Sequence, residues 1–241
     1  MPETNPTIRG EGRCFPVVEH FTSINGEGTH VGRLAAFVRF RGCMLSCSYC
    51  DTTWANAGNA PAQMMSVADI VSFVESQPAS CVTLTGGEPL LQDGIDELLV
   101  ALLANPDRYV EIETNGAVPL AGFAALRQRL VGDAPERLSF TMDCKLPSSG
   151  MDDRMDWENY AVLDSRDTVK FVIGDEVDFP AVLRVIDDYQ LQERCAVYLS
   201  PVYGQMDPAR IVEFMREHGL RHATLQLQLH KILWPDAVKG V

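Results

Sequence analysis

The sequence lacks long hydrophobic runs and is poor in basic residues. No stretch approaches the roughly 18 consecutive apolar residues that cross a bilayer, and the first residues lack the apolar centre of a secretion signal. Only 20 Lys and Arg stand against 33 Asp and Glu, which gives a net charge of −13. Nucleic acids and anionic membrane surfaces both require clustered cations. We therefore expect a cytoplasmic protein that binds neither nucleic acid nor membrane, and whose ligand is a small molecule.

The remaining composition is that of an ordinary folded protein. Apolar residues make up 46% of the chain and charged residues 22%, which is typical of globular domains with a buried core. At 241 residues, the chain is long enough for a single barrel-type α/β domain. We expect residues 1–15 to form a flexible extension and residues 16–241 to form one domain.

Short runs rich in β-branched residues alternate with apolar-faced helical stretches along this domain. Strands are expected at 17–24, 34–40, 82–85, 109–113, 138–143, 168–173, 196–200 and 223–229. Helices are expected after a capping-box-like Ser66 and Asp69, over 92–104 and 180–189, and between Asp207-Pro208 and Gly219. Repeated βα units of this kind predict a mostly parallel sheet, open or curled into part of a barrel. Functional loops then lie at the carboxyl ends of its strands.

Three of the seven cysteines form a compact motif directly after the second expected strand. Cys43, Cys47 and Cys50 have the spacing C-x3-C-x2-C. A closed zinc or iron–sulfur site uses four protein ligands, whereas three thiolates around a cubane leave one iron open to an outside ligand. The alternative is a zinc site completed by a distant residue such as Cys81, Cys144 or a histidine.

A second motif, Thr-Gly-Gly-Glu-Pro, occupies residues 85–89 between a strand and a helix. Its two glycines allow a ligand to approach the backbone closely, and Glu88 offers a carboxylate to an ammonium group. The two motifs together resemble those of the radical S-adenosylmethionine (SAM) enzymes. This resemblance implies a partial, incomplete TIM-like β/α barrel with a [4Fe-4S] cluster on Cys43, Cys47 and Cys50.

The same resemblance implies that SAM binds at the open iron. Its methionine part would contact Gly87 and Glu88, its adenine would lie between Tyr49 and Asp51, and its ribose would bind Glu113. The complete set of SAM contacts implied by the resemblance is Tyr49, Cys50, Asp51, Gly87, Glu88, Glu113, Asp143, Cys144, Lys145 and Ser200.

Further motifs narrow the family. Ser-Ile-Asn-Gly-Glu-Gly at 23–28, Cys-Asp-Thr at 50–52 and Gln-Leu-His-Lys-Ile-Leu-Trp at 228–234 resemble those of the 7-carboxy-7-deazaguanine synthases, from about residue 17 to residue 241. Members are small homodimeric radical SAM lyases of queuosine and 7-deazapurine biosynthesis. The resemblance implies conversion of 6-carboxy-5,6,7,8-tetrahydropterin to 7-carboxy-7-deazaguanine with loss of ammonia. It also implies catalytic use of SAM, a requirement for Mg²⁺, and an external flavodoxin-like one-electron reductant.

The resemblance also assigns residues to this substrate. The implied substrate contacts are Ile24, Asn25, Gly26, Arg39 and Thr85, the implied Mg²⁺ ligand is Thr52, and the catalytic candidates are Glu27 and His230, with Lys231 beside them. Arg39 offers a guanidinium fork to a carboxylate, and a hydroxyl oxygen suits Mg²⁺. The family usually has Gln where this chain has Asn25, so that contact is expected to be lost or bridged by water. A second Gly-Glu-Gly at 10–12 is expected to have no role.

Two other functions remain open at this stage. An activating enzyme that takes hydrogen from a glycine of a partner glycyl radical enzyme would use the same cluster and SAM. A non-catalytic zinc-binding module would use the cysteines alone. The motifs at 23–28, 50–52 and 228–234 favour the small-molecule synthase over both.

Overall fold

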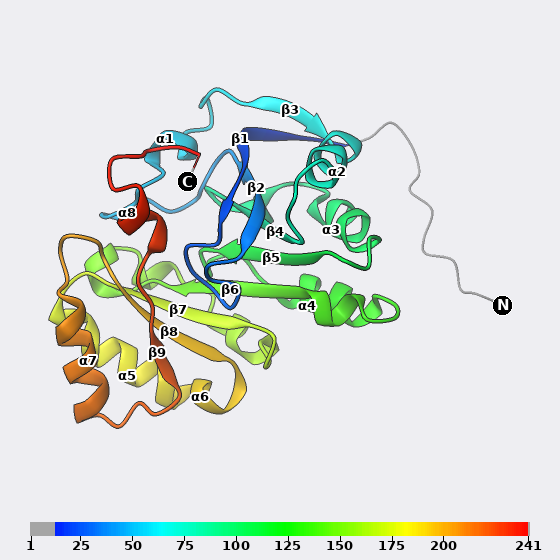
Figure 1. Ribbon diagram of the computed structural model, residues 1–241. Helices are drawn as coiled ribbons and strands as arrows, with labels where there is room; N and C mark the ends of the chain where they lie inside the picture. Colours follow the sequence, from blue (N-terminus) through cyan, green and yellow to red (C-terminus); the bar gives the residue numbers. More distant parts are fainter. Residues whose placement is uncertain (1–12, 241) are drawn as a thin grey trace.

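A nine-stranded sheet in the order β3-β1-β2-β4-β5-β6-β7-β8-β9 forms the centre of the computed structural model, which describes residues 13–240 (Figure 1). The strands are β1 (Cys14–Ile24), β2 (Leu34–Phe40), β3 (Gln63–Ser66), β4 (Cys81–Gly86), β5 (Tyr109–Thr114), β6 (Leu138–Cys144), β7 (Thr168–Ile173), β8 (Ala196–Pro201) and β9 (Ala223–Leu225). Neighbours from β2 to β9 are parallel, whereas β1 pairs antiparallel with β2 and β3. The sheet curls but keeps β3 and β9 as edges, so it is the expected incomplete barrel.

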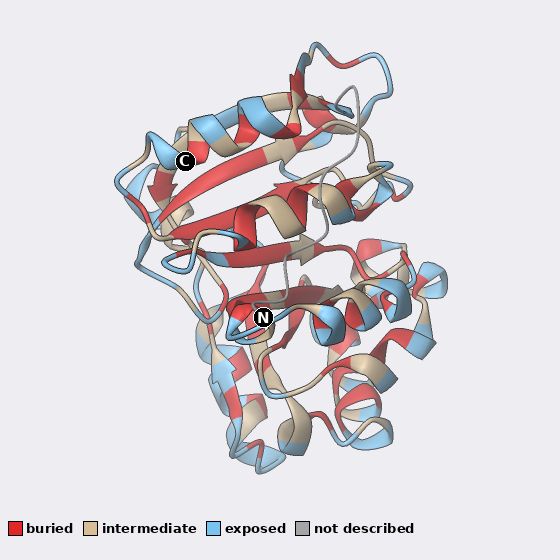
Figure 2. Cartoon of the chain, turned by 90° about the vertical axis from the view of Figure 1, so that its right-hand side faces the viewer, coloured by how far each residue is buried: buried red, intermediate tan, exposed pale blue. Residues whose placement is uncertain are grey.

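Helices follow most of the parallel strands. They are α1 (Thr53–Asn56), α2 (Val67–Glu75), α3 (Ile95–Leu103), α4 (Ala121–Arg129), α5 (Phe179–Asp188), α6 (Leu191–Arg194), α7 (Pro208–Glu217) and α8 (Leu229–Leu233). Figure 2 shows largely buried strands beneath helices whose outer faces are exposed. The short α1 and α8 instead lie near the end of the chain (Figure 1). No helix within residues 13–240 has the length and apolar character needed to span a membrane.

The predicted starting points of two helices, α2 and α7, are confirmed. The Ser66 hydroxyl accepts a hydrogen bond from the Asp69 amide at 3.1 Å, and the Asp69 carboxylate accepts one from the Ser66 amide at 2.9 Å. This capping box satisfies two donors that the first turn of α2 would leave without partners. Asp207 accepts from the Ala209 amide at 2.9 Å at the start of α7. Both helices therefore begin where side-chain capping allows.

The expected boundary of the amino-terminal extension is wrong by at least two residues. Strand β1 begins at Cys14, which pairs with Ser66 of β3, and Phe15 is 1% exposed within the core. The strand Gln63–Ser66 was not expected from the sequence, because it contains no β-branched residue. Residues 1–12, with the Gly-Glu-Gly at 10–12, lie outside the described residues.

The last expected strand is also too long. Strand β9 ends at Leu225, because the next side chain, Gln226, bonds to the backbone of Gly28, accepting from its amide at 2.8 Å and donating to its carbonyl at 3.1 Å. The Leu229 amide then donates to the Gly26 carbonyl at 3.2 Å. These bonds turn the chain across the carboxyl ends of the strands, so His230 lies on α8 and not at a strand end.

Candidate functional site

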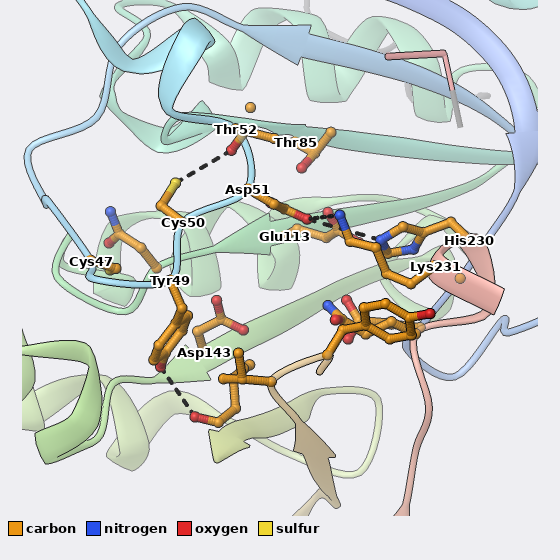
Figure 3. A pocket seen from close by; sticks show the side chains of 18 of the residues that line it. Cys47, Tyr49, Cys50, Asp51, Thr52, Thr85, Glu113, Asp143, His230 and Lys231 are labelled. Carbon is orange, nitrogen blue, oxygen red and sulfur yellow. Dashed lines mark hydrogen bonds and ion pairs between the residues drawn. The ribbon is translucent and has the colours of Figure 1, made fainter. Parts of the chain in front are cut away.

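A cleft of about 630 Å³ lies where the parallel strands from β2 to β7 end (Figure 3). The loop between β1 and β2, helix α8 and residues 235–238 complete its walls. Most of the residues expected to function meet here. The predicted residues that line the cleft are Ile24, Gly26, Glu27, Arg39, Cys43, Cys47, Tyr49, Cys50, Asp51, Thr52, Thr85, Gly87, Glu113, Asp143, Lys145, His230 and Lys231.

The cysteine loop and the glycine motif pack backbone against backbone. The Glu88 amide donates to the Gly42 carbonyl at 2.8 Å, and the Gly87 amide donates to the Phe40 carbonyl at 3.1 Å. A Cβ atom added to Gly87 would clash with the Gly42 carbonyl. Gly87 is therefore required because the cysteine loop lies directly on it, and a Cβ atom on Gly86 would clash with the Phe40 backbone at the end of β2.

The three thiols of the loop are half-buried, and none is joined in a disulfide. The Asn115 amide nitrogen donates to the Cys43 sulfur at 3.4 Å, and that of Asn56 donates to the Cys50 sulfur at 3.4 Å. Burial raises the pKa of the Cys47 thiol, although the Lys145 ammonium opposes this. Within residues 13–240, no three Cys, His, Asp or Glu side chains lie close enough to hold one metal ion. Thiols spaced along one loop fit a cluster that takes each thiolate on a different iron.

Four alternating charges cross the floor of the cleft. The Lys170 ammonium lies 3.0 Å from Glu27 Oε2 and 3.1 Å from Asp143 Oδ1, and the Lys145 ammonium lies 2.6 Å from Asp143 Oδ2. Burial alone would lower the pKa of Lys170, but Asp143 and Glu27 outweigh it and hold the pKa well above its ordinary value. Burial would raise the pKa of Asp143, but the two ammonium groups lower it. Both lysines are therefore charged at neutral pH.

Sequence analysis missed Lys170, although a signal was present. It is the one charged residue of Thr-Val-Lys-Phe-Val-Ile in β7, a strand that is buried along its whole length. A lysine in such a strand requires a partner of opposite charge. Lys170 could therefore have been recognised as part of a polar site.

A carboxylate, an ammonium group and an imidazole lie together on the opposite wall, as Figure 3 shows for Asp51, Lys231 and His230. The Lys231 ammonium lies 2.9 Å and the His230 ring nitrogen 4.0 Å from Asp51 Oδ2. Burial would raise the pKa of Asp51, but the hydrogen bond and the charge of Lys231 outweigh burial, so the pKa of Asp51 is lowered. Burial is the main cause that lowers the pKa of His230. His230 is therefore largely neutral at neutral pH, as a proton acceptor must be.

Arg39 points into the cleft from β2 with one side of its guanidinium already held. Its Nε donates to Glu19 Oε1 at 2.7 Å, and both side chains are largely buried. The Gly240 amide in turn donates a hydrogen bond to Glu19 Oε2 at 3.2 Å. Glu19 therefore fixes the orientation of Arg39 and leaves its two terminal nitrogens for a ligand.

Glu88 does not face the cleft, contrary to expectation. Its carboxylate is fully buried and accepts hydrogen bonds from the Leu90 amide at 3.0 Å, the Thr114 hydroxyl at 3.0 Å and the Asn115 amide at 2.7 Å. Burial raises its pKa to about 7. The carboxylate thus joins the ends of β4 and β5, and the structure contradicts the prediction that it meets the ammonium group of a ligand.

Asn25 is likewise turned away from the cleft. It is 2% exposed, accepts from the Thr83 hydroxyl at 2.7 Å and donates to Glu111 Oε2 at 3.3 Å. Its side chain therefore anchors the loop that carries Gly26 and Glu27. Its polar atoms are bonded beneath the loop, so this side chain offers no free polar atom to a ligand in the cleft.

Cys144 and Ser200 do not line the cleft either. Cys144 is 1% exposed and lies against Tyr160. Successive side chains of a strand point to opposite faces, so Cys144 points outward while Asp143 and Lys145 line the cleft. Ser200 is fully buried, and its hydroxyl has no hydrogen-bond partner among the described residues. Direct contact of these two side chains with SAM is contradicted by their burial.

The end of the chain closes the cleft on the side of α1. The Lys239 ammonium lies 4.2 Å from the ring centroid of Trp54 in α1, and the Gly240 amide reaches Glu19. A cation over an indole face is a favourable contact. No motif in this segment indicated such a role.

Comparisons with known proteins identify the relatives of this chain. The family model described as the radical SAM superfamily matches residues 37–132. The chain is 44% identical to a 7-carboxy-7-deazaguanine synthase of Clostridium acetobutylicum, covering 94% of this chain and 99% of that protein. It is 37% identical to the synthase of Methanospirillum hungatei, covering 95% and 88%. The crystal structure of QueE from Escherichia coli has a similar fold, with a TM-score of 0.66, 21% identity and coverage of 89% and 94%.

Proposed function

The chain belongs to the 7-carboxy-7-deazaguanine synthase family of radical SAM enzymes, and on this premise we propose that its cleft converts 6-carboxy-5,6,7,8-tetrahydropterin into 7-carboxy-7-deazaguanine with loss of ammonia. One observation carries the proposal: the cysteine loop and the oriented Arg39 fork open into the same cleft of about 630 Å³. That volume is within the range of small-molecule sites. The enzyme is accordingly a lyase of queuosine biosynthesis.

Cys43, Cys47 and Cys50 would hold the [4Fe-4S] cluster. With SAM bound, the cluster supplies the one-electron chemistry for hydrogen abstraction. Tyr49 is anchored beside the loop by its hydroxyl, which donates to the Val172 carbonyl at 3.1 Å (Figure 3). This bond supports a fixed aromatic wall for the adenine. The Gly87 backbone, Glu113, Asp143 and Lys145 also line the cleft and supply polar groups, and Asp51 supplies a carboxylate from the opposite wall.

The pterin would occupy the side of the cleft formed by β2, β4 and the loop between β1 and β2. Arg39 presents its terminal nitrogens to the substrate carboxylate, because Glu19 holds its Nε. Thr85 donates to the half-buried Glu113 and lies beside Arg39 in register. Ile24 at the end of β1 and Gly26 in the following loop line this side of the cleft, and Glu27 contributes a carboxylate. These groups can form hydrogen bonds to the carboxylate and to the N–H donors of a reduced pterin.

His230 would act as proton acceptor at the opposite wall. Its ring is held against the Gly26 backbone and faces Asp51 and Lys231. Because burial keeps the imidazole neutral, it can take a proton near neutral pH. The loss of ammonia requires such proton transfers.

Thr52 would be the protein ligand to Mg²⁺. Its hydroxyl lines the cleft 3.7 Å from the Cys50 sulfur, at the start of α1 (Figure 3). Mg²⁺ prefers oxygen ligands and retains several waters. The Thr52 hydroxyl, the substrate carboxylate and water molecules would therefore form its coordination shell.

Three further assignments are proposed from the family: a homodimer, a flavodoxin-like one-electron reductant and a cytoplasmic location. Exposed apolar side chains on and after α8, at Ile232, Leu233 and Trp234, are compatible with burial in a dimer. Light scattering of the purified protein tests the oligomeric state directly. A mass equal to one chain would contradict the homodimer.

The function is tested under anaerobic conditions. The reconstituted protein is mixed with SAM, reductant, Mg²⁺ and 6-carboxytetrahydropterin, and the products are identified by mass spectrometry. Formation of 7-carboxy-7-deazaguanine supports the proposal. Cleavage of SAM to 5′-deoxyadenosine without this product would contradict it, and would favour an activating enzyme that acts on a protein glycine.

A further inference from the structure

Lys170 connects two parts of the cleft that are contributed by different segments of the chain. Its ammonium lies 3.0 Å from Glu27, on the loop between β1 and β2, and 3.1 Å from Asp143, at the end of β6. Asp143 continues the contact to Lys145 at 2.6 Å. We call Glu27, Lys170, Asp143 and Lys145 the charge ladder. One end lies beside the proposed pterin groups and the other beside Cys47 and Tyr49.

The charge ladder is shielded from water. The Lys170 side chain is 9% exposed, Glu27 10%, Lys145 10% and Asp143 21%. In such surroundings charges interact more strongly and are screened much less by salt than at the surface. Removing one charge leaves its partner uncompensated. A change in charge or position at one end of the charge ladder therefore alters the electrostatic interactions at the other end.

The two carboxylate oxygens of Glu27 differ in their contacts. Its Oε2 bonds to Lys170, whereas its Oε1 is buried without a hydrogen-bond partner among the described residues. A buried acceptor without a donor is unfavourable unless a ligand supplies the donor. Glu27 lines the cleft, so this oxygen suits an N–H group of the bound pterin.

We propose that Lys170 is a positioning residue that couples the two ligand sites, so that the pterin and SAM each strengthen the binding of the other. This inference rests on the proposed function. A donor on Glu27 Oε1 fixes the carboxylate and draws its charge away from Lys170. Lys170 then binds Asp143 more firmly, and SAM meets a side chain that is already ordered. Coupling of this kind is reciprocal by thermodynamic necessity.

The coupling has a consequence for the reaction. Reductive cleavage of SAM without substrate would waste the reagent and expose the protein to oxidation. If SAM binds tightly only beside a bound pterin, cleavage is restricted to complexes that can react. Lys170 thus links occupancy of the two sites without contacting the reacting atoms.

The test measures binding, not turnover. Equilibrium dialysis of labelled SAM against the reconstituted holoenzyme, without reductant, gives the dissociation constant with and without saturating 6-carboxytetrahydropterin. Coupling between sites is typically about 5-fold or more, so we expect the pterin to tighten SAM binding at least about 5-fold in the unaltered protein. Lys170→Met keeps the length of the side chain and removes its charge, and should reduce this ratio to near one.

A second variant guards against misfolding of the first. Glu27→Gln breaks the same link from the other end and leaves Lys170 paired with Asp143, so it should also bring the ratio near one. Arg210→Gln removes an exposed ion pair with Glu176 on the outer helices and should keep the full ratio. Thermal unfolding and iron content of each variant report whether the fold and the cluster persist.

A ratio near one in the unaltered protein would overturn the coupling, even if 7-carboxy-7-deazaguanine is formed. A full ratio in Glu27→Gln, or in a folded Lys170→Met, would overturn the role of Lys170. Coupled binding without formation of product would support the coupling but overturn the proposed function. Absence of pterin binding would overturn both the coupling and the proposed function.

Discussion

Replacing Glu111 by Gln should make the stability of this protein less dependent on pH. Glu111 is 2% exposed, and its carboxyl group meets the Thr141 hydroxyl and the Asn25 amide. Burial, followed by the nearby carboxylate of Glu113, raises its pKa to about 8. The side chain is therefore mostly protonated at neutral pH. An amide has the same shape and keeps a hydrogen bond to each neighbour.

The size of the effect follows from the pKa of about 8. In the unfolded chain Glu111 loses its proton near its ordinary pKa of about 4.3. Because the folded protein holds the proton more tightly, the stabilisation is fully present below the unfolded pKa. It is lost as pH rises toward the folded pKa. At about 1.4 kcal/mol per pH unit, the unaltered protein should lose about 3 kcal/mol relative to Glu111→Gln between pH 5.5 and 8.

Urea denaturation of both proteins, without cluster, at several pH values measures this difference. The free energy of unfolding of Glu111→Gln minus that of the unaltered protein should increase by about 3 kcal/mol over this range. Glu75→Gln, which changes an exposed carboxylate on α2, serves as the control and should show almost no such trend. A difference that stays constant with pH would refute the neutral, buried state of Glu111.

Other changes give separate results. Cys47→Ala should lose iron, visible cluster absorbance and turnover together, whereas Cys195→Ala, outside the cleft, should keep all three; iron retained by Cys47→Ala would contradict the cluster site. Thr52→Ala should retain the cluster and SAM cleavage but alter the Mg²⁺ dependence of product formation. An unaltered dependence would remove Thr52 from the metal site. Glu88→Ala leaves its hydrogen-bond donors unsatisfied and should lower the free energy of unfolding by about 3 kcal/mol or more, measured in urea, with a smaller loss for Glu88→Gln.

Much of the fold could be predicted because its signals are local. Alternation of β-rich runs and amphipathic helices indicated the parallel part of the sheet, and the Ser66 capping box indicated the start of α2. The short strand β3 and the early end of β9 could not be predicted in this way. They depend on pairing with Cys14 and on the bonds of Gln226 to Gly28, both of which join residues far apart in the sequence.

The sequence predicts which motifs form the candidate site, but it does not predict the direction in which each side chain points. Asn25 and Glu88 belong to motifs that surround the cleft, yet both are held beneath it by hydrogen bonds to residues in β5 and just after it. Cys144 could have been separated from Asp143 by strand alternation alone. Lys170 was missed because its importance arises from carboxylates on two other segments. Tertiary contacts therefore decide which residues of a motif reach the ligand.

The central claim is that one cleft holds both ligands side by side. A crystal structure of the reconstituted enzyme with SAM and 6-carboxytetrahydropterin tests it most directly. We expect SAM against Tyr49 and Asp143, and the pterin carboxylate on the terminal nitrogens of Arg39 while Glu19 keeps its Nε. A pterin bound outside this cleft, or a carboxylate that leaves Arg39 paired with Glu19 alone, would contradict the account.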